Sequence, residues 1–157
     1  MTIEDLKRTN LYIEYCKELN RYYNSKWSPA TEHESVTTAE SYLSDIQFTW
    51  HDLTKDGLLV GFLITARNLI YIHGKGLYIC ECYIRPSYRG QGLFGKEIIP
   101  MLEDNKHPVY LEILEKNQKT KRMWDHIFKQ TGYKMQHKYL RRAYHASILE
   151  YCYEKEK

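Results

Sequence analysis

The chain has 157 residues, a length typical of one folded domain rather than two. Its 23 Lys and Arg and 20 Asp and Glu leave a formal net charge of +3, too small a surplus to indicate by itself a protein that coats DNA or membranes. Apolar residues make up 43% and charged residues 27%, a balance that excludes an intrinsically disordered chain. We therefore expect one domain over residues 1–157.

The start of the chain and its cysteines indicate a cytoplasmic protein. Residues 1–5 lack the apolar stretch of a signal peptide, and no run of about eighteen apolar residues is present, so no membrane partner is expected. The cysteines show no CxxC spacing, so we expect reduced thiols rather than disulfides. They are Cys16, Cys80, Cys82 and Cys152.

The aromatic composition is unusual, with 15 tyrosines against 4 phenylalanines. Each tyrosine carries a hydroxyl that needs water or a partner when its ring is buried. This excess is consistent either with a wet aromatic cleft or with a tyrosine-rich rim of the core.

Two helices are predicted first. A capping-box spacing that starts at Thr2 precedes apolar residues at helical intervals, which predicts an amphipathic helix over residues 3–24 with its tyrosines toward the core. Residues 25–36 are expected to be a loop. The capping signal recurs at Thr37 and predicts a short helix that reaches Ile46.

Strands follow the helices. Residues 47–53 and 58–66 show a strand pattern around a turn at 54–57, which predicts an antiparallel hairpin. A further strand is expected over residues 77–84, where Pro86 closes it.

The second half alternates helix and strand. A helix is predicted after a glycine-rich turn, and a strand at 109–114 should lie parallel to 77–84 because a helical crossover joins them. A last helix is expected to end at Gly132, and the tail from Tyr133 should form one or two strands. The chain is therefore expected to be an α/β domain with a mixed sheet.

The glycine-rich turn is the strongest functional signal. It lies between a strand and a helix, where glycines allow close approach of an anion to free backbone amides. Its sequence is Arg89-Gly90-Gln91-Gly92-Leu93-Phe94-Gly95-Lys96.

Two well-known phosphate motifs match this turn only in part. The glycine spacing and Glu112, about 20 residues later, fit a dinucleotide fingerprint, but that fold needs several more parallel strand–helix units than this chain has. A P-loop is also disfavoured, because Glu97 stands where a Ser or Thr must hold magnesium.

The order of elements and the motif fit a third family better. The segment from Tyr83 to Leu93, followed by helix, strand and helix, resembles the acetyl-coenzyme A-binding core of the GNAT family of N-acetyltransferases. Arg89 and Gly92 take two positions of the family pattern, and Phe94 departs from the third, which is Gly or Ala. The resemblance covers roughly residues 47–134.

This resemblance implies a fold and a binding site for acetyl-CoA. We expect a mixed, mostly antiparallel sheet flanked by helices, in which the strands 77–84 and 109–114 splay apart and hold the pantetheine arm between them. The amides of the glycine-rich turn would hold the pyrophosphate. The residues implied to bind acetyl-CoA are Cys82, Tyr83, Ile84, Arg89, Gly90, Gln91, Gly92, Leu93, Phe94, Gly95 and Asn117.

The implied reaction is direct attack of a primary amine, from a small molecule, peptide or protein, on the thioester. Glu81 is the candidate base and Glu112 is its rival. The family's usual acid is a tyrosine of the last helix, a position that falls on Trp124 or Phe128 here, and neither side chain gives up a proton. The remaining candidates for the acid are Tyr83, Tyr88 and Tyr133.

Other interpretations remain open. Stacking aromatics with Lys and Arg would also suit a GNAT-like modifier of a nucleic-acid base. The missing helix tyrosine would also suit a non-catalytic CoA-binding module. No metal is expected, because Cys80 and Cys82, which strand alternation places on one face, lack partner ligands nearby in sequence. The C-terminal strands could support a homodimer through an exposed sheet edge.

Overall fold

The N-terminal helices are α1 (Ile3–Tyr23) and α2 (Glu32–Ser44) in a computed structural model that describes residues 2–23, 32–69, 72–143 and 146–156. The amide of Asp5 donates to Oγ1 of Thr2 at 3.0 Å, so the predicted capping spacing does begin α1.

The predicted bounds of the second helix were wrong. α2 already begins at Glu32, and the Thr37 hydroxyl donates to the carbonyl of His33 inside the helix at 3.0 Å rather than capping its start. It also ends at Ser44, before the exposed Ile46. Residues 32–36 of the predicted loop are therefore helical, and its other residues, 25–31, lie outside the described residues.

The described strands form one six-stranded sheet in the order β1-β2-β3-β4-β6-β5. Only the β3–β4 pair is parallel, so the predicted mixed, mostly antiparallel sheet is confirmed. The tail forms two strands. The strands are β1 (Phe48–Lys55), β2 (Leu58–Arg67), β3 (Leu77–Ile84), β4 (Val109–Leu114), β5 (Tyr133–Ala143) and β6 (Ala146–Lys155).

The turn of the first hairpin is shorter than predicted. Asp56 and Gly57 both have positive φ, 51° and 79°, as in the two-residue turns that match the twist of paired strands. Thr54 and Lys55 therefore still pair with β2 rather than belonging to the turn.

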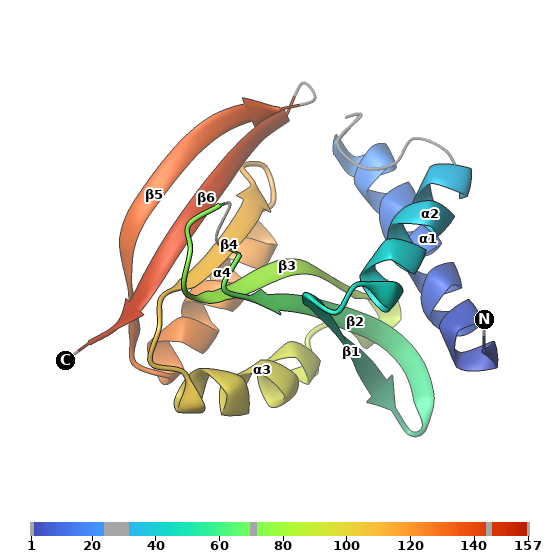
Figure 1. Cartoon of the computed structure of the whole chain (residues 1–157), viewed down its shortest axis with the longest axis horizontal. Coiled ribbons are helices and arrows are strands. Elements are labelled where there is room, and N and C mark those ends of the chain that lie inside the picture. The colour runs from blue at the N-terminus through green and yellow to red at the C-terminus, as the bar shows by residue number, and fades with distance from the viewer. Residues whose placement is uncertain (1, 24–31, 70–71, 144–145, 157) are drawn as a thin grey trace.

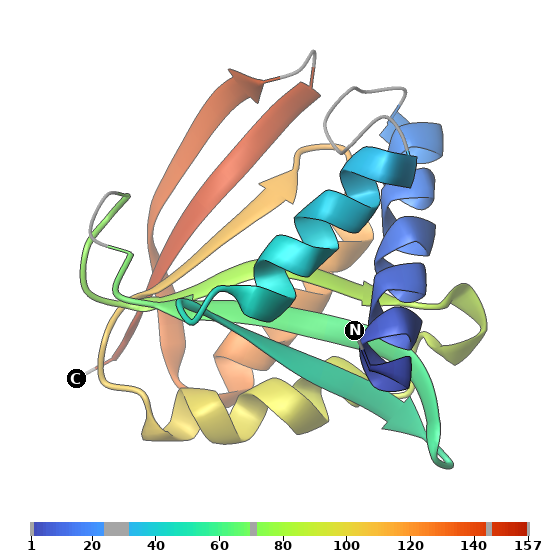
Figure 2. The same cartoon turned by 45° about the vertical axis from the view of Figure 1, so that its right-hand side comes forward.

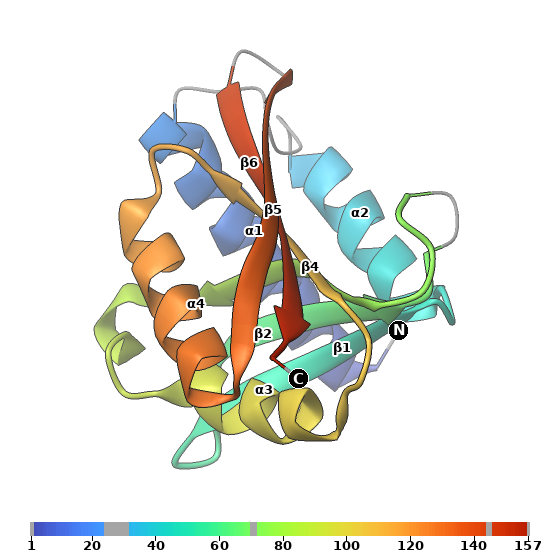
Figure 3. The same ribbon diagram turned by 90° about the vertical axis from the view of Figure 1, so that its left-hand side faces the viewer.

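Helices cover both faces of the sheet. Figure 2 and Figure 3 show α1 and α2 on one face and α3 (Leu93–Asp104) with α4 (Gln118–Gln130) on the other. A core cluster lies on each side, one around Leu11, Tyr12 and Phe62 under α1 and α2, and a larger one around Ile98 and Trp124 under α3 and α4. The sheet thus separates two packed layers.

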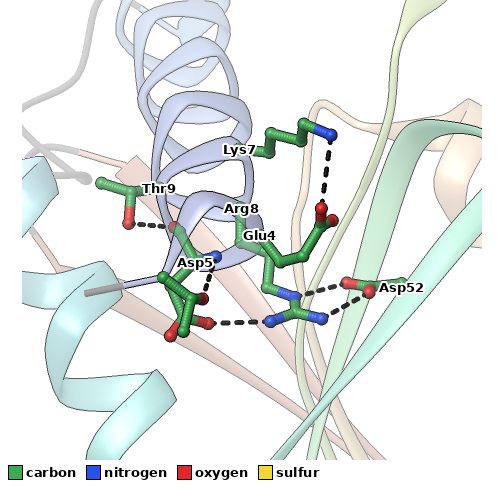
Figure 4. A network of polar contacts seen from close by, with 7 residues as sticks. Glu4, Asp5, Lys7, Arg8, Thr9 and Asp52 are labelled. Carbon is green, nitrogen blue, oxygen red and sulfur yellow. Dashed lines mark hydrogen bonds and ion pairs between the residues drawn. The ribbon is translucent and has the colours of Figure 1, made fainter.

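An ion pair fixes the first turns of α1 on the edge strand (Figure 4). Arg8 donates Nε and Nη2 to the two carboxylate oxygens of Asp52 on β1, at 2.9 and 2.8 Å. Its Nη1 donates to Asp5 at 2.8 Å. This bidentate geometry resists sliding of the helix along the strand, because sliding would break both hydrogen bonds to Asp52 at once.

The parallel strands separate after a short paired segment. Pairing of β3 with β4 covers only Leu77–Ile79 against Val109–Leu111. Beyond it, β4 pairs with β6 while β3 continues with β2, and Figure 1 shows the two halves of the sheet diverging. The splayed strand pair expected from the resemblance is therefore present.

Candidate active site

A cavity of about 100 Å³ lies where β3 and β4 separate; we call it the gap cavity. Glu81 and Cys82 line it from β3, Glu112 from β4, and Asn117 and Trp124 from the start and middle of α4. The separation of the two strands thus brings side chains from several elements around one space.

A bulge in β3 decides which way these side chains point. Ile64 of β2 lies opposite Glu81 and Thr65 lies opposite Ile79, so Cys80 is an extra residue in the ladder. Cys80 therefore packs against the cluster under α1 and α2, whereas Cys82 packs against the cluster under α3 and α4. The prediction that the two cysteines share a face was wrong, because it assumed an unbroken alternation.

Glu81 lies among phenols on the α1–α2 side of the gap. The Tyr12 hydroxyl donates to Oε2 of Glu81 at 2.6 Å, and Tyr42 and Tyr15 lie near enough to the same carboxylate to influence its pKa. Burial raises the pKa of Glu81 to about 7, and the three tyrosines oppose this rise. Such a carboxylate is half ionised near neutral pH and can accept a proton there.

The tyrosines around Glu81 are functional candidates that sequence reasoning missed. Tyr12 and Tyr15 were expected only to face the core, and Tyr42 was expected only as a helix residue. Their rings do pack in the core, since the ring centroids of Tyr12 and Phe62 lie 5.7 Å apart. The Tyr12 hydroxyl nevertheless also reaches the carboxylate of Glu81. The available signal was the excess of tyrosine over phenylalanine, of which a wet aromatic cleft was one interpretation.

The glycine-rich turn forms the start of α3, as predicted. Gly92 is the N-cap residue with a φ of 73°, and Gly90 has a φ of 78°, values that residues with a Cβ rarely adopt. The amides of the first turn, Leu93–Gly95, have no carbonyl partner within the helix and carry its positive dipole end. This geometry suits an anionic ligand.

Two arginines near this turn are held by α1. Nη2 of Arg89 lies 2.8 Å from both carboxylate oxygens of Glu18, and its Nε donates to the carbonyl of Ile84 at 2.8 Å. Arg85 makes a similar pair with Glu14 at 2.9 and 3.0 Å. The charge of Arg89 is thus directed at α1 in this structure rather than at the amides of the turn.

The remaining predicted binding residues lie on β3, at the start of α4 and on the glycine-rich turn. Cys82 lines the gap cavity, while Tyr83 packs under α1 and Ile84 under α3. Asn117 caps α4 by accepting from the Thr120 amide at 3.2 Å, which leaves its side-chain NH₂ as the donor beside the cavity. Phe94 is buried in the core, and Gln91 is exposed on the turn.

The structure separates the other catalytic candidates. Glu112 lines the gap cavity, across the gap from Glu81. Tyr133 lines neither described cavity, because its hydroxyl accepts from Asn105 at 2.8 Å in the core under α3. Tyr88 also packs against that core. Of the two residues at the position of the family tyrosine, Trp124 lines the gap cavity and Phe128 does not.

A second cavity of about 260 Å³ adjoins the first; we call it the outer cavity. Ile79, Cys80, Leu111 and Glu112 line both cavities. Its remaining wall is mostly aromatic, including a stack in which Tyr110 lies 4.6 Å from His73 and 4.9 Å from Tyr78. The outer cavity therefore offers ring faces next to the carboxylates of the gap.

No group of three or more His, Cys, Asp and Glu within residues 2–23, 32–69, 72–143 and 146–156 has an arrangement that could hold a metal ion. Over the same ranges, no helix is both long and apolar enough to cross a membrane.

Solved acetyltransferases share this fold. An acetyltransferase from Thermus thermophilus superposes with a TM-score of 0.63 at 15% identity, covering 93% of this chain and 90% of that one. The ribosomal-protein-S18-alanine N-acetyltransferase from Escherichia coli gives 0.60 at 18%, with 100% and 92% covered. A chimeric spermidine N-acetyltransferase from Vibrio cholerae gives 0.62 at 17%, with 97% and 92% covered. At these identities the likeness concerns the fold alone.

The sequence itself assigns the family. The chain belongs to the Acetyltransferase (GNAT) family, whose model matches residues 12–128 and so includes the glycine-rich turn, β3, β4 and most of α4. None of the curated proteins searched matches the chain. Acetyl-CoA is the usual donor of this family.

Proposed function

We propose that the chain is an N-acyltransferase that moves the acetyl group of acetyl-CoA to a primary amine of a small molecule, peptide or protein. The observation that carries this proposal is the carboxylate of Glu81, half-buried in the wall of the gap cavity with its pKa raised to about 7. A group of this kind suits the removal of a proton from an amine near neutral pH. Membership of the family supports acetyl-CoA as the donor.

In the proposed reaction the amine nitrogen attacks the thioester carbonyl carbon directly. The new C–N bond forms, the C–S bond breaks, and its electron pair moves to the sulfur. Glu81 accepts the proton that the amine nitrogen loses, directly or through one water. The Tyr12 hydroxyl holds the carboxylate in place through its hydrogen bond of 2.6 Å.

We assign the donor to the gap and the acceptor to the outer cavity. The pyrophosphate would bind the amides at the start of α3, where the positive dipole end and the left-handed Gly92 favour an anion. The pantetheine arm would lie between β3 and β4, with Asn117 donating to one of its amides. The acceptor would reach Glu81 past Cys80 and Glu112, which line both cavities. The aromatic wall of the outer cavity suits an amine with an apolar body.

Binding of acetyl-CoA to the purified protein, measured by calorimetry, is the first test. We expect micromolar binding that Gly92→Asp abolishes, because the substitution strains a left-handed position and adds a negative charge beside the pyrophosphate. Gly57→Asp is the matched control, since Gly57 has a similar φ of 79° and equally open space but lies in the β1–β2 turn. No binding by the folded wild type would refute the proposal.

Turnover is the second test. Release of free thiol from acetyl-CoA would be followed across a panel of small amines, peptides and proteins. Acetyl transfer to any of these amines that is lost when Glu81 is replaced would support the proposed N-acyltransferase activity. Tight binding without turnover on any amine would instead favour a CoA-binding module.

A further inference from the structure

The indole of Trp124 has a buried hydrogen-bond donor without a partner. The side chain is fully buried, and it packs between Phe94 and Phe128 with ring distances of 6.1 and 5.8 Å. Its Nε1–H makes no hydrogen bond to a nitrogen or oxygen atom of the residues that the structure describes. Buried donors are almost always paired, so an unpaired one in the wall of a cavity points to an acceptor that a ligand brings.

The position of the indole indicates which ligand atom this is. Trp124 lies close to the thiol of Cys82, whose pKa burial raises to about 12 while the indole opposes the rise. A thiol is only a weak acceptor and does not satisfy the N–H. Trp124 and Cys82 belong to the cluster under α3 and α4, whereas Glu81 lies among the phenols on the other side of the gap.

The two sides of the gap therefore offer different chemistry to one thioester. The α1–α2 side holds the carboxylate that accepts the proton of the amine. The α3–α4 side holds an N–H donor at the edge of an apolar cluster. A thioester bound in the gap would thus have the carboxylate on one side for the proton of the amine and the indole N–H on the other side for the sulfur.

We infer, building on the proposed function, that Trp124 is a catalytic residue whose indole N–H donates a hydrogen bond to the departing sulfur of coenzyme A. The C–S electron pair moves to sulfur, the indole keeps its proton, and the thiolate takes a proton from water after it leaves. A hydrogen bond to the anionic thiolate is stronger than one to the neutral thioester. Trp124 thus stabilises the transition state more than the bound substrate.

Trp50 provides a matched control within the same chain. Its Nε1–H is also buried without a partner among the described residues, and its ring packs 4.7 Å from Phe62. Trp50 lines neither the gap cavity nor the outer cavity. Removing its N–H therefore tests the loss of an indole donor as such, away from the thioester.

The experiment compares coenzyme A with desulfo-coenzyme A, in which hydrogen replaces the thiol. Their affinities would be measured by calorimetry over a range of increasing alkaline pH, with ultraviolet absorbance following thiolate formation in the bound coenzyme A. The proteins are the wild type, Trp124→Phe, Trp50→Phe, and a variant with benzothienylalanine at position 124. That residue keeps the bicyclic ring and replaces only the N–H with sulfur.

For the wild type we expect the preference for coenzyme A over desulfo-coenzyme A to grow as the bound thiol ionises. Both changes at position 124 should reduce that preference by about 10- to 100-fold, the value of one hydrogen bond to a charged group. Trp50→Phe should leave it unchanged. An equal preference in the wild type and in a folded benzothienylalanine variant would overturn the role of Trp124 while leaving the proposed function intact. Absence of any coenzyme A binding by the wild type would overturn both.

Discussion

At the scale of single residues, the site depends on two opposing effects on Glu81. Burial disfavours the charged carboxylate, and the hydroxyls of Tyr12, Tyr15 and Tyr42 favour it. The result is a pKa near 7, where the group can take a proton from an amine and release it again. A carboxylate in water, with a pKa of about 4.3, would be too weak a base for this task.

Replacing this carboxylate tests its role directly. We expect Glu81→Gln to lower the rate of acetyl transfer by about 10²- to 10⁴-fold, the usual contribution of a general base, while acetyl-CoA binding is retained. In the wild type the rate should rise with pH through about 7 as Glu81 ionises. Glu112→Gln is the comparison, because Glu112 is the rival base at the same gap. A loss of rate confined to Glu112→Gln would reassign the base.

The phenols should control the pH at which the base works. Tyr12→Phe removes one donor to Glu81, so the pKa of the carboxylate should rise and the rising limb of the pH–rate profile should move up by about one pH unit. Tyr139→Phe on the exposed face of β5 is a control that should leave the limb in place. A lower rate with an unmoved limb would show that Tyr12 has only a packing role.

At the scale of elements, α1 links Glu81, the proposed base, to the loop proposed to bind the donor. Tyr12 on its buried face reaches Glu81, while Glu14 and Glu18, about one turn apart, hold Arg85 and Arg89. The same helix is anchored at its start by Arg8 on β1. Movement of α1 would therefore affect both halves of the site.

The Glu18–Arg89 pair should compete with the donor. Glu18→Gln removes the carboxylate that engages Arg89, so the guanidinium becomes available to the pyrophosphate and acetyl-CoA affinity should rise by up to about fivefold, the value of a partly exposed ion pair. Calorimetry at low and moderate salt measures this. Glu4→Gln, which removes an exposed carboxylate paired with Lys7 on the same helix, controls for net charge. A fall in affinity would mean that Glu18 orients Arg89 for binding.

At the scale of the whole molecule, the raised pKa of the half-buried Glu81 makes stability depend on pH. The folded protein holds the proton of Glu81 up to about pH 7, whereas the unfolded chain releases it near pH 4.5. Between these values the folded state binds more protons than the unfolded state, so the free energy of unfolding falls as the pH rises. Stability from this group is complete below pH 4.5 and lost above 7.

Denaturant unfolding at several pH values measures this dependence. Relative to Glu81→Gln, the wild type should lose about 3 kcal/mol of unfolding free energy between pH 4.5 and pH 7, because each unit of pKa shift is worth about 1.4 kcal/mol. Because Glu81→Gln keeps every other titrating group, it controls for the pH dependence that those groups contribute. A difference between the two proteins that does not change with pH would contradict a half-buried, protonated Glu81.

Self-association through the C-terminal strands stays a prediction. β5 is the edge of the described sheet, and it exposes Met135, Tyr139 and Leu140. An edge strand with apolar side chains is a surface on which a second chain can pair.

Much of the architecture follows from local signals in the sequence. The bounds of β3 and β4 were predicted to the residue, and their parallel arrangement followed from the helical crossover between them. The glycine-rich turn at Gly92 was also predicted, because its left-handed backbone needs glycine whatever surrounds it. The start of α2 was missed, because a threonine hydroxyl serves equally well inside a helix and at its cap.

The chemistry of the site was decided by the tertiary structure. The sequence by itself determined the family motif, the order of elements and Glu81 as a candidate base. It did not indicate the bulge at Cys80, which depends on how two strands pair and turns Cys80 and Cys82 to opposite faces. The contacts of Tyr12 with Glu81 and of Glu18 with Arg89 join residues about 70 positions apart, and only packing of α1 on the sheet brings such residues together. Because pKa depends on burial and neighbours rather than on residue type, the ionisation of Glu81 near neutral pH also belongs to the folded state.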